Sequence, residues 1–315
     1  MTGGTGFLGK TLLDYCGESA SVHGQHFHLT VMSRSPEQFL RTAPQYDGIG
    51  WLSFVRGDVA SFPAPLHGVT DVIHAAANTH SVLDGMTWID QIVGGARCAL
   101  RWAVDSGARR FLLMSSGAIY GPQPPDVARM QETFGGAPAT TAASSVYGQA
   151  KRLAEQLCTI YAATSTLQTI IARCFAFTGP HVPLDGPYAM GNFIRDALWA
   201  DCIRVRGDGS AVRTYLYGRD MARWIMTLLL RGRSGEAYNV GSDQPINMAG
   251  LAAAVALQLC PGKPVVVENA LEDSGARSVY VPDIAKAQQL GLSVETPLAQ
   301  AIKLSAQGSV RPLNH

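Results

Sequence analysis

The stretch TGGTGFLG, residues 2–9, decides the fold. It contains two overlapping glycine patterns, Gly3-x-x-Gly6-x-x-Gly9 and Gly4-x-Gly6-x-x-Gly9. Glycines allow a turn to adopt positive φ, and they allow its backbone to approach a pyrophosphate at the positive N-terminal end of the next helix. We therefore expect a dinucleotide-binding loop, although an ordinary strand–turn–helix corner would also carry such glycines.

Outward from this loop, short β-branched runs alternate with helical patterns as far as residue 175, which is typical of βαβ units and a parallel sheet. We predict a helix that begins near Phe7, and Ser144 or Ser145 as the N-cap of a later helix. The predicted strands are 27–33, 52–57, 71–77, 110–116 and 168–175, and the other predicted helices are 86–105 and 144–163. The fold class is α/β, with a Rossmann-type doubly wound parallel sheet.

The composition of the sequence changes at residues 177–187, FTGPHVPLDGP, which are rich in residues that favour turns. We predict a cofactor-binding domain at 1–176 and a smaller α+β substrate lobe at 177–315, with the segment of about 210–232 packing back on the first domain. In this lobe we expect helices near 191–199, 219–231, 246–258, 283–290 and 296–306, with short strands between them.

The start of the chain is unusual, because an apolar strand normally precedes such a glycine loop and here the loop begins at residue 2. We expect either that the recorded start lies downstream of the true one or that the first, central strand is absent. Its absence would be costly, since a central parallel strand is buried on both faces and provides ladder partners to its neighbours.

The composition excludes several classes of protein. The 25 basic and 24 acidic residues give a net charge of +1, so nucleic acid is not expected as a partner. No uncharged run approaches the roughly 20 residues that cross a bilayer, and the start has no basic leader region, so we expect no membrane association. The six cysteines lack a CxxC pair, which favours reduced thiols, no metal site and a cytoplasmic protein.

The predicted strand at 27–33 ends at Ser33 and is followed by Arg34, without the carboxylate that would bind the ribose 2′-hydroxyl of NAD. We therefore favour NADP(H) over NAD(H), with both residues at the 2′-phosphate; alternatively, Arg34 is a solvated loop residue. Asp58 follows the next strand and could accept a hydrogen bond from the adenine amine, or it could be a helix N-cap.

Tyr147 and Lys151 lie four residues apart in a helical pattern, so both side chains leave one face of the helix. A phenol whose pKa is near 10 is a poor base at neutral pH, and a neighbouring ammonium would stabilise the phenolate. The alternative is a chance pair at this spacing.

Five motifs occur in order: TGGTGFLG, HAAA at 74–77, SSGAIYG at 115–121, YGQAK at 147–151 and RCFAFTGP at 173–180. Through these motifs the chain resembles the extended short-chain dehydrogenase/reductases, specifically the NAD-dependent epimerase/dehydratase family acting on nucleotide sugars. The resemblance covers essentially the whole chain. The resemblance implies that Tyr147 is the general acid/base, that Lys151 binds the nicotinamide ribose and lowers the pKa of Tyr147, and that Ser116 binds the reacting oxygen. The cofactor residues that it implies are Gly3, Gly6, Phe7, Leu8, Gly9, Ser33, Arg34, Asp58, Val59, Ala75, Ala76, Ala77, Tyr147 and Lys151.

On the substrate side, the resemblance places Arg213 at the nucleotide diphosphate, which suits a guanidinium fork. Arg277 is a second candidate, although its spacing is unusual, and Asn192 resembles an amide that binds the diphosphate or sugar. Thr79 and His80 would line the sugar pocket with Ser116. For all of these residues a surface, capping or structural role is the alternative.

The chain also departs from the family pattern. Gly117 and Ala118 stand where dehydratases carry an acidic pair and decarboxylases a glutamate, and Ala176 replaces a common asparagine. We therefore expect a nucleotide-sugar 4-epimerase or 4-keto reductase. The alternatives are a dehydratase or decarboxylase of this family, or a non-catalytic NADP-binding regulatory protein. By resemblance we also expect a homodimer formed through the helices at 86–105 and 144–163.

Overall fold

The computed structural model describes residues 1–24, 27–76, 84–268 and 278–308. Its contacts divide the chain into two compact units, which are described separately. The first unit comprises Met1–Gly121, Gly136–Cys174 and Ala222–Tyr238, and the second comprises Pro122–Gly135, Phe175–Met221 and the chain from Asn239 onward. The division of the sequence after residue 176 stays a prediction.

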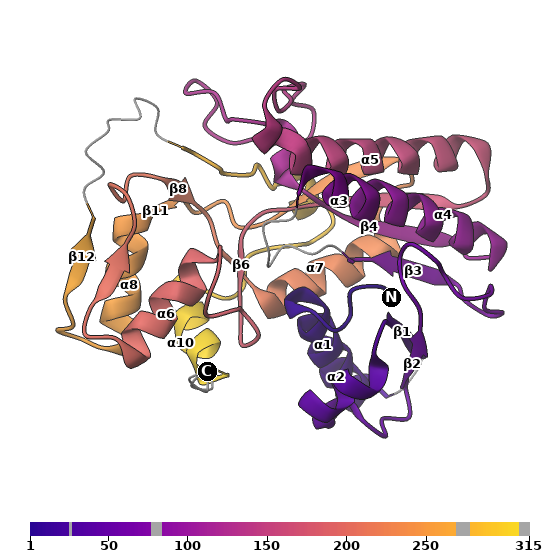
Figure 1. Ribbon diagram of the computed structural model, residues 1–315, viewed down its shortest axis with the longest axis horizontal. Helices are drawn as coiled ribbons and strands as arrows, with labels where there is room; N and C mark the ends of the chain where they lie inside the picture. Colours follow the sequence, from indigo (N-terminus) through magenta and orange to yellow (C-terminus); the bar gives the residue numbers. More distant parts are fainter. Residues whose placement is uncertain (25–26, 77–83, 269–277, 309–315) are drawn as a thin grey trace. The chain divides into compact units, whose positions relative to one another are not determined.

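The first unit contains the parallel sheet of an α/β fold, as predicted (Figure 1). Its strands are β1 (Leu29–Ser33), β2 (Leu52–Arg56), β3 (Asp71–His74), β4 (Arg110–Ser116) and β5 (Gln168–Cys174). The strand β10 (Glu236–Val240), which we expected in the second lobe, pairs with β5 and gives the order β10-β5-β4-β3. Its last three residues are buried, so the pattern of a short apolar run did not reveal which sheet it joins.

The first residues of the chain join the two groups of strands. Thr2 forms parallel bridges to Met32 of β1 and to His74 of β3. Its amide donates to the carbonyl of Ile73 at 3.0 Å, and the amide of Met32 donates to the carbonyl of Met1 at 2.9 Å. The glycine loop follows at once, so it starts where the order of the strands reverses, which is the usual place for a ligand in such a sheet.

Helices of the first unit cover the sheet. They are α1 (Phe7–His23), α2 (Pro36–Thr42), α3 (Gly85–Ile89), α4 (Gly95–Asp105), α5 (Val146–Thr164) and most of α7 (Gly218–Arg231). Short 3-10 turns occupy Pro44–Tyr46, Gly117–Tyr120 and Ala143–Ser145. Apolar residues of α4 and α5 form one core with β4 and β5, including Leu100, Phe111, Ala154 and Ile171. A second core around Leu13, Val31 and Trp51 joins α1 and α2 to β1 and β2.

One helix prediction needs correction. The single helix predicted at 86–105 is interrupted by a π-helical turn at Asp90–Gly94 between α3 and α4. Two adjacent glycines, Gly94 and Gly95, weaken the α-helical preference at this point. Ser145 occupies the N-cap position of α5 as predicted, but no side-chain hydrogen bond caps the helix there, because Ser145 lies in a 3-10 turn with helical backbone angles.

The second unit is α+β, as expected. Its strands pair as β6 (Phe177–Thr178) with β9 (Leu216–Tyr217), β7 (Ile203–Val205) with β12 (Val265–Val267), and β8 (Val212–Arg213) with β11 (Ile246–Asn247). Its helices are α6 (Ala189–Trp199), α8 (Met248–Leu259), α9 (Ala285–Gln288) and α10 (Leu298–Gln307).

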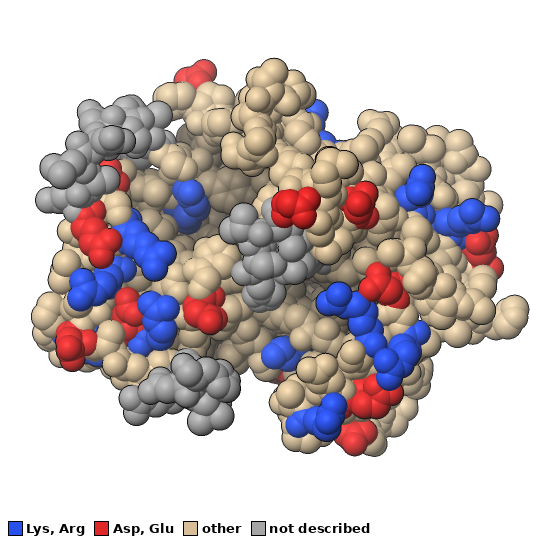
Figure 2. Space-filling model, in the orientation of Figure 1, with Lys and Arg blue, Asp and Glu red and all other residues tan. Residues whose placement is uncertain are grey.

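Figure 2 shows basic and acidic side chains interspersed over the face in view. All six cysteines are free, and three of them, Cys16, Cys158 and Cys174, are buried. Among the described helices, none combines the length and the apolar character that a membrane span requires.

Candidate active site

The glycine loop is held tightly between β3 and α1. Gly3 has a φ of 72°, and a Cβ at this position would lie 2.6 Å from the carbonyl carbon of Ala75. A Cβ at Gly9 would overlap the carbonyl oxygen of Gly3. Side chains at these two positions would push the loop away from the sheet and from α1, so both glycines are needed for this geometry.

The N-terminus of α1 has the properties of an anion site. The helix begins at Phe7 with Gly6 as the N-cap residue, and no side chain caps it. No acidic side chain lies in its first turn. The amides of the first turn and the helix dipole therefore favour a negatively charged group. This geometry fits the pyrophosphate of a dinucleotide held by Gly3, Gly6, Phe7, Leu8 and Gly9; their roles stay predictions.

A buried contact that we did not predict links the start of this loop to the end of β3. The hydroxyl of Thr2 lies 2.9 Å from Nδ1 of His74 and accepts a hydrogen bond from the amide of Ala76 at 3.3 Å. Burial, together with the charge of Lys151, lowers the pKa of His74 to about 3, so the imidazole is neutral at physiological pH. The pair fixes the backbone that leads into Ala75 and Ala76, two of the predicted cofactor residues.

The ends of β1 and β2 form an open, charged edge. The hydroxyl of Ser33 accepts a hydrogen bond from the amide of Ser35. The side chain of Arg34 is 82% exposed, and its Nε lies 4.0 Å from a carboxylate oxygen of Asp58. Asp58 accepts a hydrogen bond from the amide of Ala60 at 2.8 Å in a turn, so it does not cap a helix. Both charged groups are accessible to a ligand.

Ser116 lies at the end of β4, and it is buried. Its hydroxyl accepts a hydrogen bond from the amide of Ala118 at 3.1 Å, in the 3-10 turn that follows the strand. The start of α5 packs on this turn at Gly148, where a Cβ would lie 2.6 Å from the carbonyl oxygen of Ala118. Gly148 therefore permits the close approach of α5, and the sequence motif gave no geometric hint of this role.

Tyr147 and Lys151 lie on α5, as predicted. The ammonium nitrogen of Lys151 lies 6.0 Å from the centre of the Tyr147 ring and donates to the carbonyl of Met114 at 2.8 Å. Tyr147 is partly buried and packs against Trp88, with 5.2 Å between ring centres. Burial lowers the pKa of Lys151 to about 8, while Cys174 and Glu155 act in the opposite direction. A lysine with this pKa holds its proton less tightly than an exposed one.

The turn after β4 carries no carboxylate. Gly117 and Ala118 begin the 3-10 turn, and neither has a side chain that could exchange a proton. The nearest acidic residue along α5 is Glu155, which forms an ion pair with Arg173 at 2.9 Å. Neither residue was predicted as part of the site, although Glu155 lies one helical turn after Lys151 and Arg173 opens the fifth motif.

Two predicted substrate residues lie in the second unit. Arg213 donates to the carbonyl of Val212 and to the carbonyl and hydroxyl of Ser278, and its guanidinium lies 5.9 Å from the ring centre of Tyr280. The amide nitrogen of Asn192, in α6, donates to the carbonyl of Gly186 at 2.9 Å. Ala77, Thr79, His80 and Arg277 lie outside the described residues.

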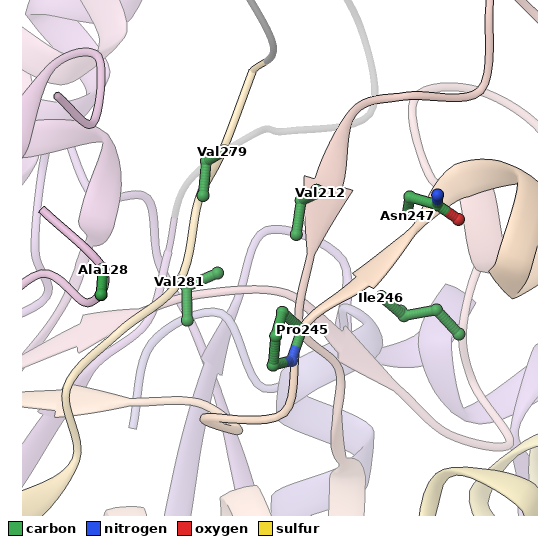
Figure 3. A pocket seen from close by; sticks show the side chains of 7 residues that line it. All are labelled: Ala128, Val212, Pro245, Ile246, Asn247, Val279 and Val281. Carbon is green, nitrogen blue, oxygen red and sulfur yellow. The ribbon is translucent and has the colours of Figure 1, made fainter. Parts of the chain in front are cut away.

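A pocket of about 350 Å³ lies in the second unit, and Figure 3 shows the side chains that line it. It lies at the β8–β11 pair, and Val212 in its wall immediately precedes Arg213. Its lining residues are Ala128, Val212, Pro245, Ile246, Asn247, Val279 and Val281. Because none of these residues is charged, they could contact an uncharged part of a ligand but could not neutralise a diphosphate.

Comparisons with known proteins identify the family of the chain. The model of the NAD dependent epimerase/dehydratase family matches residues 1–241. A UDP-glucuronic acid decarboxylase of Arabidopsis thaliana is 28% identical over 310 residues, covering 96% of this chain and 86% of the relative.

Solved structures show the same fold. A dTDP-glucose 4,6-dehydratase from Streptomyces venezuelae, solved with NAD bound, matches with a TM-score of 0.81 and 24% identity, covering 98% of this chain and 95% of that one. A UDP-glucose 4-epimerase from Thermotoga maritima, solved with UDP-glucose, matches with a TM-score of 0.79 and 22% identity, covering 98% and 96% of the two chains.

Proposed function

Because the chain belongs to the NAD-dependent epimerase/dehydratase family, we propose that it transfers hydride at a hexose carbon of a nucleotide sugar, as a 4-epimerase or a 4-keto reductase. The observation that carries this proposal is the buried Lys151 ammonium beside the Tyr147 ring on α5, in a site whose β4 turn has no carboxylate at residues 117 and 118. Proton transfer and hydride transfer need the first feature, whereas elimination and decarboxylation need a further acid.

In this proposal the bound dinucleotide supplies hydride transfer at its nicotinamide ring. The phenolate of Tyr147 takes the proton from the sugar hydroxyl when the sugar is oxidised, and the phenol formed in this way returns it to the carbonyl oxygen when the sugar is reduced. The ammonium of Lys151 stabilises the phenolate by its charge, and the hydroxyl of Ser116 donates a hydrogen bond to the reacting oxygen. The partial exposure of Tyr147 supports access to the phenol.

For the cofactor we propose NADP(H) in preference to NAD(H). The end of β1 carries Ser33 and the exposed Arg34 and no carboxylate, which suits a 2′-phosphate. Asp58 and Val59 would lie at the adenine. The carboxylate of Asp58, 4.0 Å from Arg34, opposes the preference by reducing the positive charge there, so we expect NAD(H) to bind more weakly rather than not at all.

For the substrate we propose a nucleotide-diphosphate sugar, with Arg213 at the diphosphate. Its guanidinium is held by Ser278 and lies over Tyr280, so its fork is oriented before a ligand arrives. Asn192 would be a second contact, although its amide nitrogen would have to leave the carbonyl of Gly186 to bind a ligand.

The experiment is incubation of the purified protein with NADPH, or with NAD and NADP, and a panel of 4-keto and ordinary nucleotide sugars. An epimerase interconverts sugars while the cofactor is regenerated in each turnover. A reductase consumes NADPH in proportion to product. Absence of both reactions over the whole panel would refute both forms of the proposal.

A second candidate is decarboxylation of UDP-glucuronic acid, which the similarity to the Arabidopsis enzyme favours. The missing carboxylate at Gly117 and Ala118 argues against it. The assay is release of carbon dioxide from UDP-glucuronic acid in the presence of NAD. We expect none; turnover there would replace our first proposal.

We also propose a homodimer formed through α3, α4 and α5. Leu153 and Ile160, seven residues apart on α5, are 48% and 47% exposed, and Val104 of α4 is 39% exposed. Residues at this spacing lie on one face of a helix, and an apolar face of this kind is typical of an interface. Light scattering should give twice the mass of one chain. The double variant Leu153→Lys/Ile160→Lys should give the mass of a single chain.

A further inference from the structure

The mechanism proposed above does not use a deeply buried ion pair of the first unit, formed by Arg173 and Glu155. Two guanidinium nitrogens of Arg173, on β5, donate to the carboxylate of Glu155, on α5, at 2.9 Å from Nη2 and 3.2 Å from Nε. Their side chains are only 14% and 10% exposed. A buried, two-pronged pair of this kind holds two elements in one geometry, because its hydrogen bonds are directional.

Two more side chains complete the cluster. The hydroxyl of Ser115 donates to Glu155 at 2.5 Å, and Nη1 of Arg173 donates to the hydroxyl of Tyr120 at 2.9 Å. Ser115 and Arg173 are direct neighbours across the β4–β5 ladder. The cluster therefore joins both strands and the 3-10 turn after β4 to α5.

The position of this cluster relative to the proposed catalytic groups is specific. Glu155 lies one turn after Lys151 on the same face of α5, and Ser115 immediately precedes Ser116 on β4. Lys151 itself donates to the carbonyl of Met114. Two successive turns of α5 are thus attached to two successive residues of β4, directly before Ser116.

The carboxylate of Glu155 is one of the groups that affect the protonation of Lys151. Cys174 from β5, His74 from β3 and Tyr147 from α5 also act on the ammonium or lie beside it. Burial keeps His74 neutral, and it raises the pKa of Cys174 to about 12, so that thiol is uncharged near neutral pH. The carboxylate of Glu155, which is paired with Arg173, acts in the direction that favours a protonated Lys151.

We propose that Glu155, held by Arg173 and Ser115, is a positioning residue that fixes the register of α5 on β4 and keeps the Lys151 ammonium charged beside Tyr147. A buried ion pair of this kind adds little net stability to the fold, because desolvation of the two charges offsets most of their attraction. The kinetic part of this inference rests on the proposed function, whereas its electrostatic part concerns the protein without substrate.

The test is a titration of the lysine side chains by NMR in protein labelled with ¹³C at the lysine ε-carbon. The chain has only five lysines, Lys10, Lys151, Lys263, Lys286 and Lys303, so the Lys151 signal is identified by its loss in Lys151→Met. In Glu155→Gln the pKa of Lys151 should fall, because an attraction is lost and the charge of Arg173 is left unbalanced. In the double variant Glu155→Gln/Arg173→Gln the pKa of Lys151 should fall less than in Glu155→Gln, because the charge of Arg173 is removed as well. If Glu155→Gln does not fold, the double variant is titrated in its place.

Ser115→Ala tests the positioning part, since it keeps all charges and removes one hydrogen bond. We expect kcat to fall about ten- to a hundredfold with little change in KM, as for a small displacement of a catalytic group. The matched control is Thr169→Val, which removes a buried hydrogen bond from β5 to the carbonyl of Cys158, further along α5. It should change neither the pKa of Lys151 nor kcat.

An unchanged pKa of Lys151 in both glutamine variants, with reduced thermal stability, would mean that the cluster is structural only and would overturn the inference. Equal loss of kcat in Ser115→Ala and Thr169→Val would overturn the inference that the cluster positions the catalytic groups. If no nucleotide sugar is turned over by the unmodified protein, the proposed function fails, but the NMR titration still decides the electrostatic part.

Discussion

Two regions of the first unit pair an arginine with a carboxylate, and they do so in opposite ways. At the ends of β4 and β5, Arg173 and Glu155 are 2.9 Å apart with side chains 14% and 10% exposed. At the ends of β1 and β2, Arg34 and Asp58 are 4.0 Å apart with side chains 82% and 41% exposed. The buried pair is in a medium where its geometry is fixed, while water screens the open pair and leaves it free to rearrange.

This difference indicates that the two regions have different functions. The closed region holds the groups that we propose for proton transfer, because their alignment has to be set before substrate arrives. The open region holds the groups that we propose for recognition of the cofactor, which can adjust to a bound phosphate. Substitutions in the closed region should therefore change rate, and substitutions in the open region should change affinity.

The largest effect is expected for Tyr147→Phe. Removal of the phenol hydroxyl eliminates the proposed acid/base, so turnover should fall by about 10² to 10⁴ while cofactor binding persists. Turnover measured beside fluorescence titration with NADPH checks both statements. Unchanged turnover would remove Tyr147 from the mechanism, and cofactor binding without any turnover in the unmodified protein would favour a regulatory role.

The pH dependence of kcat/KM tests the closed region next. Since the pKa of Lys151 is lowered to about 8, the ammonium is charged below this pH, and activity should decline as the pH rises through about 8. Lys151→Arg keeps a cation whose pKa exceeds about 12, so this alkaline decline should disappear although the rate is lower. An identical alkaline limb in both proteins would assign it to another group.

A smaller effect is expected where the backbone of α5 meets the turn after β4. Gly148→Ala places a Cβ 2.6 Å from the carbonyl oxygen of Ala118, so the start of α5 has to move. We expect a loss of about 1–3 kcal/mol in the free energy of unfolding, with reduced kcat. Gly94→Ala is the control, because nothing lies within 4 Å of its Cβ, and it should leave kcat unchanged. Equal kcat in the two variants would contradict the close approach.

The smallest effect on catalysis is expected at the open region. Arg34→Ala should weaken NADPH binding about ten- to a hundredfold, with NADH binding and kcat little changed, since a charge-assisted hydrogen bond is lost. Arg101→Ala is the matched control, because Arg101 is 81% exposed and lies 3.7 Å from Asp105. If NADPH and NADH lose affinity equally in Arg34→Ala, the preference for NADP(H) is wrong.

The amino-acid sequence determined the fold class and the candidate catalytic pair. Local signals were enough for both, because glycine spacing, strand alternation and the four-residue interval from Tyr147 to Lys151 are properties of neighbouring residues. The same signals located β1 to β5 within three residues at each end.

The tertiary structure alone decided the remainder. It assigned β10 to the main sheet, brought Thr2 between β1 and β3, and joined Glu155 to Arg173 and Ser115. These contacts connect residues from 18 to more than 60 positions apart, and no local pattern specifies which distant partner a polar side chain meets. The charge state of Lys151 likewise depends on burial and on neighbours from other strands, so it follows from the packing of the chain and not from the motif that contains it.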